Sequence, residues 1–528
     1  MANVLIEFLS SLSTTQVLVT SVIVLAFILY WYATSYHGVW EKLGVPGPKP
    51  LPFIDHTLEL RQGLEPAYNK WFAQYGKTFG LYGLHPHKAT LVTKDLALVK
   101  EVMVKDFDNF INSYRPEETT SSLSKGLSSA GEHIWRRHRQ VTTPMFTGAK
   151  MKLMMQHINK SAQNLTQLVK ECVDKGEVVP VKLVSRKFAT EVIARIGFGI
   201  QTHAVSKEES EFEHFAGKYV KIGKSRFWKA VNAVQHFFPM IVPVVRVFTT
   251  GVDFINFDSD NYFINILKAT MSARKCEIKK SGEEGRKTRD ILDLLMKASV
   301  SDDDPRLRDS GSKIISEDEV VSNSTMLILA GGETVSAALQ GILYSLAIHT
   351  EVLDKVIDEI DQVDALTGEV QYEQLGKLKY TEQVINEGLR LFPLLSYIMR
   401  IAAETKTYNG VTIPKGAVVQ IPTGHIMVDP EYWPDPLKFD PDRFSPENKA
   451  GRDPISFLPF GYGPRVCLGE RLAIMELKTI LVYLFREFKF GLSERTYPKL
   501  GEEIKTELIN GFVTLPVKPV LVEAFKRD

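Results

Sequence analysis

The residue best placed to carry chemistry is Cys467, within the sequence FGYGPRVCLGERLAIMELK of residues 460–478. The cysteine ends a glycine-rich, extended stretch, and a helical pattern begins at Leu468 or Gly469. Free amides and the positive end of the helix dipole at this position stabilise an anionic sulfur and lower the pKa of the thiol. From the residues alone, the segment indicates either an activated cysteine or a structural cysteine at a tight turn.

The neighbours of Cys467 suit a flat, anionic group. Gly463 and Gly469 have no Cβ atom, so a planar macrocycle could approach the backbone at either position. The guanidinium of Arg465 could donate to a carboxylate of such a group.

A second feature is the run Ala330, Gly331, Gly332, Glu333 and Thr334 inside a long apolar pattern. Glycines within a helix each cost about 1 kcal/mol relative to alanine. The pair therefore indicates either close helix packing or a local kink that opens backbone hydrogen bonds beside a ligand, with an acid and a hydroxyl at its edge.

Two pairs of residues have helical spacing. Glu387 and Arg390 are three apart in NEGLRLFP, which in isolation predicts a surface pair worth roughly a few tenths of a kcal/mol. Trp135 and Arg139 are four apart in WRRHR and would share one helix face, within reach of a cation–π contact.

The segment around Cys467 resembles the haem-binding loop of the cytochrome P-450 superfamily, F-x-x-G-x-R-x-C-x-G. Phe460, Gly463, Arg465, Cys467 and Gly469 match all its fixed positions. The resemblance implies that the chain binds haem b, that Cys467 is the axial ligand of the iron, and that the other four residues contact the cofactor. A thiolate in this position pushes electron density onto iron and favours O–O cleavage.

Residues 330–334 resemble the oxygen-activating stretch in the central helix of this superfamily. By that resemblance Thr334 would hydrogen-bond the bound oxygen, and Glu333 would help to deliver protons for O–O cleavage. Ala330 would border the distal pocket. The implied reaction inserts one oxygen atom from O₂ into a lipophilic molecule.

The spaced pairs also resemble motifs of the superfamily. Glu387 and Arg390 match its E-x-x-R pair, and Arg443, in PDRF, lies in a segment like the one that completes a buried salt-bridge network under the haem. This implied role is structural. The resemblance further implies haem propionate contacts by Trp135, Arg139 and Arg400.

Within the superfamily the chain is most similar to family three, the broad-pocket animal enzymes that act on steroids and foreign compounds. The similarity is carried by HGVWEKLGVPGPKPLP, VINEGLRLFP and FFPMIVPVVRVF. Two positions depart from the pattern: the expected HRDP reads MVDP from Met427, and Arg115 is displaced in NSYRP. The segments expected to line the distal pocket are residues 110–125, 212–238, 394–398 and 508–513, with the helix before Glu333.

Electrons must come from a separate protein, because no glycine-rich fingerprint follows a strand and opens a helix, as a flavin or nicotinamide fold requires. The resemblance implies NADPH-cytochrome P-450 reductase as partner, with cytochrome b5 as a further donor. The residues expected to form a basic docking face on the thiolate side, or alternatively a merely solvated surface, are Arg136, Arg137, His138, Arg471 and Lys478.

Two other functions remain open. A haem-thiolate isomerase or dehydratase rearranges peroxides without a reductase, but such relatives often lose the threonine that is present here as Thr334. A non-catalytic haem-binding sensor or carrier would need neither Glu333 nor Thr334. The monooxygenase is the predicted function.

The elements that position these residues are mainly helical. Helical periodicity covers residues 320–348, 351–363 and 380–391. Short β-branched runs at 411–413 and 417–421 predict strands, and the polar residues 299–313 predict a surface loop. The predicted fold is mainly α with small β sheets, and the resemblance makes it the cytochrome P-450 fold.

Residues 17–32 read VLVTSVIVLAFILYWY, and uncharged neighbours extend this stretch to about 20 residues, enough to span a bilayer. A cleaved signal peptide is the alternative, but it lacks a basic n-region and a small-residue cleavage site. Lys42 and Lys49 follow the span, so the positive-inside tendency places the remainder in the cytoplasm. We expect a single-pass anchor in the endoplasmic reticulum membrane at 1–36, a proline-rich hinge at 37–52 and a haem-thiolate catalytic domain at 53–528.

Composition excludes several classes of function. The 64 basic and 63 acidic side chains of the 528 residues give a net charge of +1, so bulk electrostatics provide no argument for a nucleic-acid partner. Cys172, Cys276 and Cys467 are too few and too far apart for a disulfide framework or a zinc cluster. This pattern fits a reducing compartment.

Overall fold

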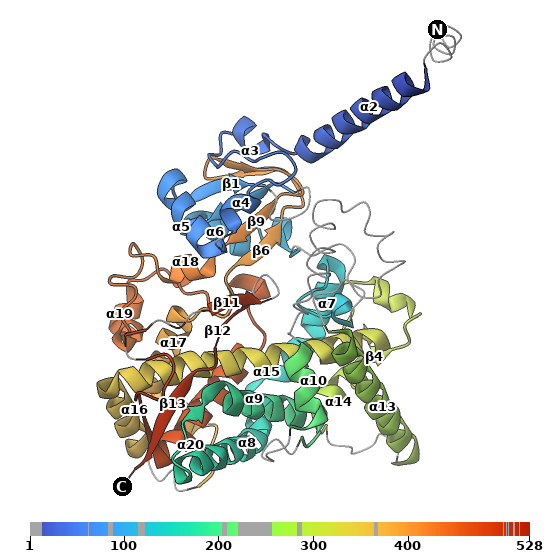
Figure 1. The fold of residues 1–528 in the computed structure, drawn as a ribbon. Helices are drawn as coiled ribbons and strands as arrows, with labels where there is room; N and C mark the ends of the chain where they lie inside the picture. The colour runs from blue at the N-terminus through green and yellow to red at the C-terminus, as the bar shows by residue number, and fades with distance from the viewer. Residues whose placement is uncertain are drawn as a thin grey trace.

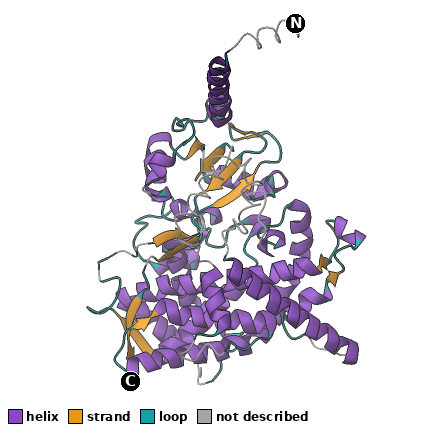
Figure 2. Cartoon of the chain, turned by 45° about the vertical axis from the view of Figure 1, so that its right-hand side comes forward, coloured by secondary structure: helices purple, strands orange, loops and turns teal. Residues whose placement is uncertain are grey.

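The computed structural model describes residues 13–61, 63–82, 88–113, 122–202, 209–219, 256–281, 288–363, 368–499, 501–502, 504, 506–509, 513–516 and 518–527. Over these residues the chain forms a mainly helical body with small sheets, as the sequence predicts. Figure 2 shows the helices packed together in the lower part of the body, with strands above them and near the C-terminus.

The helices make up most of the body. They are α2 Thr14–Thr34, α3 Val39–Lys42, α4 Thr57–Leu60, α5 Leu64–Tyr75, α6 Leu96–Lys100, α7 Glu132–Thr142, α8 Gly148–Asp174, α9 Val181–Phe198, α10 Glu211–Tyr219, α13 Phe257–Ser281, α14 Ile291–Lys297, α15 Glu317–Ile348, α16 Thr350–Gln362, α17 Lys379–Leu391, α18 Thr423–Met427, α19 Pro446–Ala450 and α20 Glu470–Glu487. Short helical turns are η1 Glu101–Lys105, η2 Phe107–Phe110, η3 Ser122–Lys125, η4 Thr143–Phe146, η6 Pro305–Arg308, η7 Gln374–Gly376, η8 Pro441–Phe444, η9 Pro454–Ser456 and η10 Gly463–Arg465. The three helices predicted from periodicity are confirmed as α15, α16 and α17, with every end within three residues.

The strands form small, separate sheets. They are β1 Thr78–Leu81, β2 Thr90–Thr93, β3 Val179–Pro180, β4 Ser299–Val300, β5 Ile315–Ser316, β6 Ile398–Ile401, β7 Lys406–Tyr408, β8 Val411–Ile413, β9 Val418–Ile421, β10 Phe488–Gly491, β11 Thr506–Ile509, β12 Val513–Pro516 and β13 Leu521–Lys526. The largest sheet has the order β1-β2-β9-β6, with β2 and β9 parallel and the other pairs antiparallel. A second sheet has the order β10-β13-β3.

The predicted strands are confirmed as β8 and β9. Between β7 and β8, Asn409 and Gly410 have φ angles of 50° and 83°, the left-handed pair that closes a two-residue hairpin. The polar stretch 299–313 contains β4 and η6, and none of its residues is buried, which agrees with a surface segment.

Helix α15 crosses the body, with α9 beside it and α8 beyond α9 (Figure 1). It begins with a capping box, in which Glu319 N donates to Ser316 Oγ at 3.2 Å and Ser316 N donates to Glu319 Oε2 at 2.8 Å. A Cβ atom at Gly331 would lie 2.2 Å from Ile193 Cδ1 of α9. Close helix packing therefore accounts for Gly331, and the helix runs unbroken from Glu317 to Ile348.

Two of the described helices are long and apolar enough to cross a bilayer. The most apolar window of α15 is 61% buried, as expected for the core helix of a folded body. The corresponding window of α2 is only 6% buried, and Figure 1 shows α2 projecting from the body at the N-terminus. Helix α2 is therefore the candidate membrane span.

The chain that follows α2 is packed against the β1 strand. Trp40 is 2% exposed, and its Nε1 donates to Leu81 O at 3.3 Å. Gly80 N donates to Pro46 O at 2.8 Å. A Cβ atom at Gly47 would lie 2.2 Å from Gly80 O, so this backbone approach requires a residue without a side chain.

A polar cluster also holds this segment. Asp55 accepts a hydrogen bond from Tyr36 Oη at 2.6 Å, and its other oxygen lies 2.7 Å from His37 Nε2. Burial and the neighbouring Asp55 carboxylate raise the pKa of Tyr36, so its phenol remains a donor. These contacts fix the path of the chain as it leaves α2.

The packing of Trp40 predicts a defect in the Gly80→Ala variant. A Cβ atom at Gly80 would lie 2.2 Å from Trp40 Cγ, so the indole must move. Overpacking of this kind costs about 1–3 kcal/mol, which should lower the thermal unfolding midpoint of the full-length protein in detergent. Gly376→Ala is the control, because a Cβ atom there meets nothing within 4 Å. Equal midpoints for both variants would contradict the docked position of Trp40.

Candidate active site around Cys467

Cys467 lies between η10 and the first residue of α20, close to the predicted helix start. Its backbone N–H donates to Phe460 O at 2.9 Å, which closes the loop of the motif on itself. Gly463 has a φ of 72°, and a Cβ atom there would lie 2.1 Å from Met103 O of η1. Gly463 is therefore explained by its backbone conformation and by contact with η1. A Cβ atom at Gly469 would lie 3.9 Å from Cys467 Sγ.

The thiol of Cys467 is exposed to solvent although it lies within the folded body. Burial among surrounding atoms raises the pKa of the thiol, while hydrogen bonds from Gly469 N–H and Glu470 N–H and the charge of Arg139 oppose the rise. The hydrogen bonds at the helix N-terminus lower the pKa of the thiol as expected, but burial raises it by more. The prediction that the pKa of Cys467 is lowered is therefore wrong for the chain alone. The side chain is therefore surrounded by protein atoms and still reached by solvent.

Helix α15 has one exposed position in its central part. Ala330 is exposed, and Glu333 and Thr334 are half-buried, whereas the next turns of the helix are buried. Thr334 Oγ1 donates to Ala330 O at 2.6 Å, and Glu333 Oε1 lies 4.0 Å from Lys182 Nζ. The acid and the hydroxyl therefore lie beside the exposed Ala330, on an unbroken helix rather than at the edge of a kink.

Helix α7 brings Trp135 and Arg139 to the cysteine loop. Arg139 Nη1 donates to Val466 O at 3.0 Å, next to Cys467. The guanidinium carbon of Arg465 lies 4.7 Å from the centre of the Trp135 ring, and Arg465 Nη2 donates to a main-chain carbonyl at 2.9 Å. Burial lowers the pKa of Arg139, and the neighbouring sulfur opposes this.

Arg400, on β6, is 6% exposed. Its Nη1 donates to Met399 O at 2.8 Å and to Ser113 Oγ at 3.2 Å, and its Nε has no partner among the described residues. Burial lowers the pKa of Arg400 to about 10, because no carboxylate of the described chain offsets the loss of water. A buried cation with an unused donor fits an anionic partner.

Asn112 links α7, which carries Arg139, to β6, which carries Arg400. Asn112 Oδ1 accepts from Glu132 N, at the start of α7, at 2.8 Å, and Asn112 O accepts from Ile401 N of β6 at 2.8 Å. No sequence motif points to this residue. Its role depends on contacts between segments far apart in the chain.

These residues fit an iron porphyrin. The cysteine supplies a soft ligand for iron. Arg139 and Arg400 donate only to neutral hydroxyl or carbonyl oxygens among the described residues, so either guanidinium could also bind a propionate. Arg465, in the cysteine loop, contacts the ring of Trp135 on α7.

Glu387, Arg390 and Arg443 form the predicted buried network. Glu387 binds Arg390 through two contacts of 2.7 and 2.8 Å, and both side chains are 0% exposed. Arg443 Nε lies 3.4 Å from Glu387 Oε1. Arg390 Nη1 donates to Met427 O at 2.8 Å. The acceptor is a main-chain carbonyl, so this hydrogen bond does not depend on the side chain at position 427, where the sequence departs from the family pattern.

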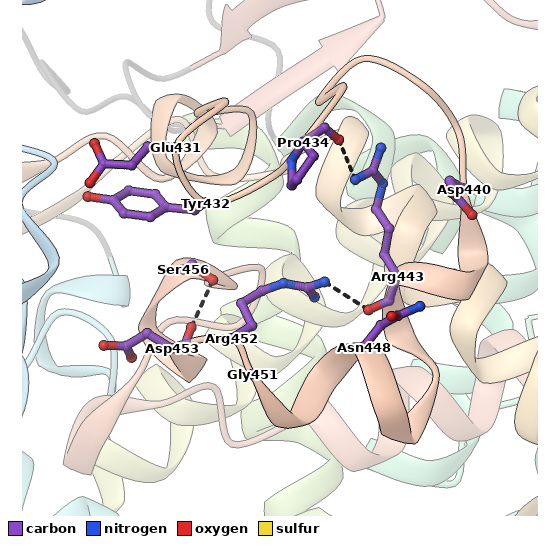
Figure 3. Close-up of a pocket in the computed structure, with 10 residues that line it drawn as sticks. All are labelled: Glu431, Tyr432, Pro434, Asp440, Arg443, Asn448, Gly451, Arg452, Asp453 and Ser456. Atoms are coloured by element: carbon purple, nitrogen blue, oxygen red, sulfur yellow. Dashed lines mark hydrogen bonds between the residues drawn. The ribbon is translucent and has the colours of Figure 1, made fainter.

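A pocket of about 510 Å³ opens beside this network. In Figure 3, Arg443 extends toward Pro434 and Arg452 toward the main chain of Arg443. Its lining residues are Glu431, Tyr432, Pro434, Asp440, Arg443, Asn448, Gly451, Arg452, Asp453 and Ser456. None belongs to the cysteine loop, so this polar pocket is distinct from the candidate site.

The predicted docking face is partly wrong. Arg137, His138 and Lys478 are 2%, 0% and 4% exposed, so none of them can meet a partner protein. Arg136 is half-buried and Arg471 is exposed. The basic surface of this region is therefore smaller than helical spacing suggested.

Glu319 explains the burial of α7 and was missed from the sequence. Its two oxygens bind Arg137 at 2.6 Å each, and His138 Nε2 lies 3.3 Å away. Burial would raise the pKa of Glu319, but hydrogen bonds from His138, Arg137 and Ser316 hold it well below its usual range. The S-x-x-E spacing from Ser316 was the available signal for the cap, although it says nothing of Arg137.

The expected pocket segment 394–398 contacts Thr514, the residue directly after the expected segment 508–513. Thr514 N, on β12, donates to Leu394 O at 2.8 Å, and Ser396 Oγ lies 2.6 Å from Thr514 Oγ1. Other expected positions lie outside the described residues, namely Arg115, Phe227, Trp228, Phe237, Phe238 and residues 510–512.

The buried network predicts a large loss of stability for Glu387→Gln. The variant leaves Arg390 at 0% exposure without its anion, and breaking a buried pair in this way costs about 3–5 kcal/mol. Thermal unfolding of the full-length protein should show a clearly lower midpoint. Glu373→Gln, which removes the exposed pair with Lys152, should leave the midpoint almost unchanged. If both variants behave alike, the network does not support the fold.

Comparison with known proteins agrees with this geometry. The sequence model of the cytochrome P450 family matches residues 45–521. Cytochrome P450 3A9 of Rattus norvegicus is 32% identical over 519 residues, which cover 98% of this chain and 97% of that protein. Cytochrome P450 3A29 of Sus scrofa is 31% identical over 520 residues, with 98% and 97% covered. Cytochrome P450 3A16 of Mus musculus is 31% identical over 520 residues, with 98% of both proteins covered. The resemblance to animal family three is confirmed, and the chain belongs to the cytochrome P450 family as a haem-thiolate monooxygenase.

Proposed function

We propose that this chain is a membrane-bound monooxygenase that inserts one oxygen atom from O₂ into a lipophilic substrate, steroid-like or xenobiotic. The observation that carries the proposal is the position of Cys467, solvent-accessible just before α20, where the half-buried Arg139 donates to Val466 O and has no carboxylate partner among the described residues. The proposed cofactor is haem b, with Cys467 as its axial ligand. When bound, the haem activates O₂, and the thiolate favours O–O cleavage.

The remaining residues of the candidate site would bind and orient the cofactor. Arg139, Arg400 and Arg465 would donate to its propionates, and Trp135 would hold Arg465 in place through the ring contact at 4.7 Å. Phe460, Gly463 and Gly469 would shape the loop, while Ala330 would border the substrate. Glu387, Arg390 and Arg443 would keep the fold around the loop rigid.

Thr334 and Glu333 would handle protons. The Thr334 hydroxyl donates to Ala330 O at 2.6 Å, which leaves its oxygen able to accept a second hydrogen bond. The Glu333 carboxylate lies 4.0 Å from Lys182, whose side chain is 30% exposed. Glu333 would therefore form the solvent end, and Thr334 the inner end, of a short proton route.

We further propose that α2 anchors the chain in the endoplasmic reticulum membrane by a single pass, with the body in the cytoplasm. The anchor would comprise residues 1–36, the hinge 37–52 and the catalytic domain 53–528. The exposed apolar surface of α2 supports this, as do Lys42 and Lys49 after the span.

Electrons would come from NADPH through NADPH-cytochrome P-450 reductase, with cytochrome b5 as a second donor. Arg471 is exposed directly after the cysteine loop, and Arg136 is half-buried on α7. These two cations remain candidates for the docking surface.

The Cys467→Ala variant tests the proposed ligand. The reduced, carbon monoxide-bound wild type should have a Soret band at about 450 nm, typical of thiolate ligation, and the variant should lose it. Cys276→Ala, which changes an exposed cysteine of α13, should keep the band. The measurement is a difference spectrum of the full-length protein in membranes. A band that persists in Cys467→Ala, or a histidine-like spectrum in the wild type, would overturn the assignment.

The Thr334→Ala variant tests the proton route. With reductase and NADPH, oxidation of testosterone as probe should slow by about 10²-fold, because the hydroxyl at the inner end of the proton route is lost, while the 450 nm band remains. Ser345→Ala is the matched control, since Ser345 Oγ makes the same type of bond, to Gly341 O at 2.9 Å, elsewhere in α15. Turnover of an organic peroxide without reductase at the full rate in both variants would favour the isomerase instead.

A further inference from the structure

A buried carboxylate joins three elements that lie beside the central helix α15. Asp260, on α13, is 5% exposed. Its Oδ1 accepts hydrogen bonds from Tyr219 Oη at 2.6 Å and from Ser122 Oγ, and its Oδ2 accepts from Ser122 N at 3.0 Å. Tyr219 is the last residue of α10, and Ser122 is the first residue of η3. One carboxylate therefore fixes α10 and η3 against α13.

The same cluster reaches α15. Ser122 Oγ lies 3.0 Å from Thr325 Oγ1, and Thr325 is 1% exposed. A second contact holds the chain after η3, because Leu127 N donates to Asn323 Oδ1 at 3.0 Å. The segment from Ser122 to Leu127 is thus held on α15 at both ends.

This segment borders the exposed part of α15. Ser128 Oγ lies 3.3 Å from Met326 Sδ, and a Cβ atom at Gly126 would lie 3.4 Å from Met326 Cβ. Met326 is half-buried and precedes the exposed Ala330 by four residues, which puts both on one helix face. The segment from Ser122 to Leu127, which Asp260 holds in place, therefore lies beside the face of α15 that carries Ala330.

The charge of Asp260 has neutral partners. Its hydrogen-bond donors are two hydroxyls and one amide, and among the described residues no cation pairs with it. Asp290, by contrast, binds Arg274 at 2.6 Å. Within the described part of the chain, replacing Asp260 by asparagine therefore leaves no buried cation unpaired, so the change tests the position of this side chain rather than charge balance.

We propose that Asp260 is a positioning residue of the distal pocket. Through Ser122 and Tyr219 it positions the segment from Ser122 to Leu127 beside Ala330. The position of this segment determines how well bulky ligands fit. The proposal rests on the proposed haem-thiolate function and assigns a determinant of ligand size to that site.

The test compares two iron-binding probes in the full-length protein in detergent. Imidazole is small enough to bind without touching this segment, whereas clotrimazole is bulky and must meet it. Asp260→Asn should raise the Kd of clotrimazole about tenfold, equivalent to ~1.4 kcal/mol, and change that of imidazole less than twofold. Both constants come from titrations followed in the Soret band. Tyr219→Phe, which removes one donor and keeps the ring, should give a smaller shift in the same direction.

Matched controls separate position from general damage. Glu359→Gln removes a carboxylate that also has neutral donors, accepting from Tyr380 N at 2.6 Å and from Thr381 Oγ1 at 2.7 Å, in the α16–α17 region. Tyr344→Phe removes a tyrosine hydroxyl that donates to Glu502 O at 2.8 Å. Both should leave the ratio of the two constants unchanged.

Three outcomes are distinguishable. A selective loss of clotrimazole affinity in Asp260→Asn and Tyr219→Phe supports the proposal. Equal effects on both probes, or none, in variants that keep the 450 nm band would overturn it. A wild type without that band would instead remove the haem-thiolate function on which the proposal rests. If Asp260→Asn does not fold, Tyr219→Phe decides alone.

Discussion

The buried ion pair of Glu387 and Arg390 shows the constraint on which this structure depends, namely that a charge removed from water requires a partner. Arg390 meets that need within the protein, through Glu387 and the carbonyl of Met427. Arg139 and Arg400 do not, because their described partners are neutral oxygens. The difference separates two uses of the same residue type. The first arginine stabilises the fold, whereas the other two have no carboxylate partner among the described residues, which is why we propose an anionic ligand for them.

Helix α15 contributes both to the stability of the fold and to the geometry of the candidate site. Its packing against α9 is close enough at Gly331 that a side chain would meet Ile193 at 2.2 Å, which fixes the rotation of the helix. That rotation leaves Ala330 exposed, with the Thr334 hydroxyl directed at the Ala330 carbonyl. A glycine required by packing thus sets where the polar residues of the same turn lie. Stability and site geometry are consequences of one contact.

Sequence patterns predicted what local interactions determine. Helix α17 and strand β8 lie where periodicity and the Asn409-Gly410 turn placed them, because spacing and turn conformation act over a few residues. Arg137 looked like part of a solvated basic helix face, yet it binds Glu319, 182 residues away. Asp260 has no motif at all, since its partner Ser122 is 138 residues distant. Contacts of this range depend on the complete fold, and no local pattern encodes them.

The thiol of Cys467 illustrates how competing local effects are decided by burial. The start of α20 donates two backbone hydrogen bonds, and Arg139 adds positive charge, both of which favour the thiolate. Burial favours the neutral form and outweighs them, so the pKa of the thiol is raised above its ordinary value. In its proposed role, the anionic form of Cys467 depends on the positive charge of the metal, to which thiols bind deprotonated.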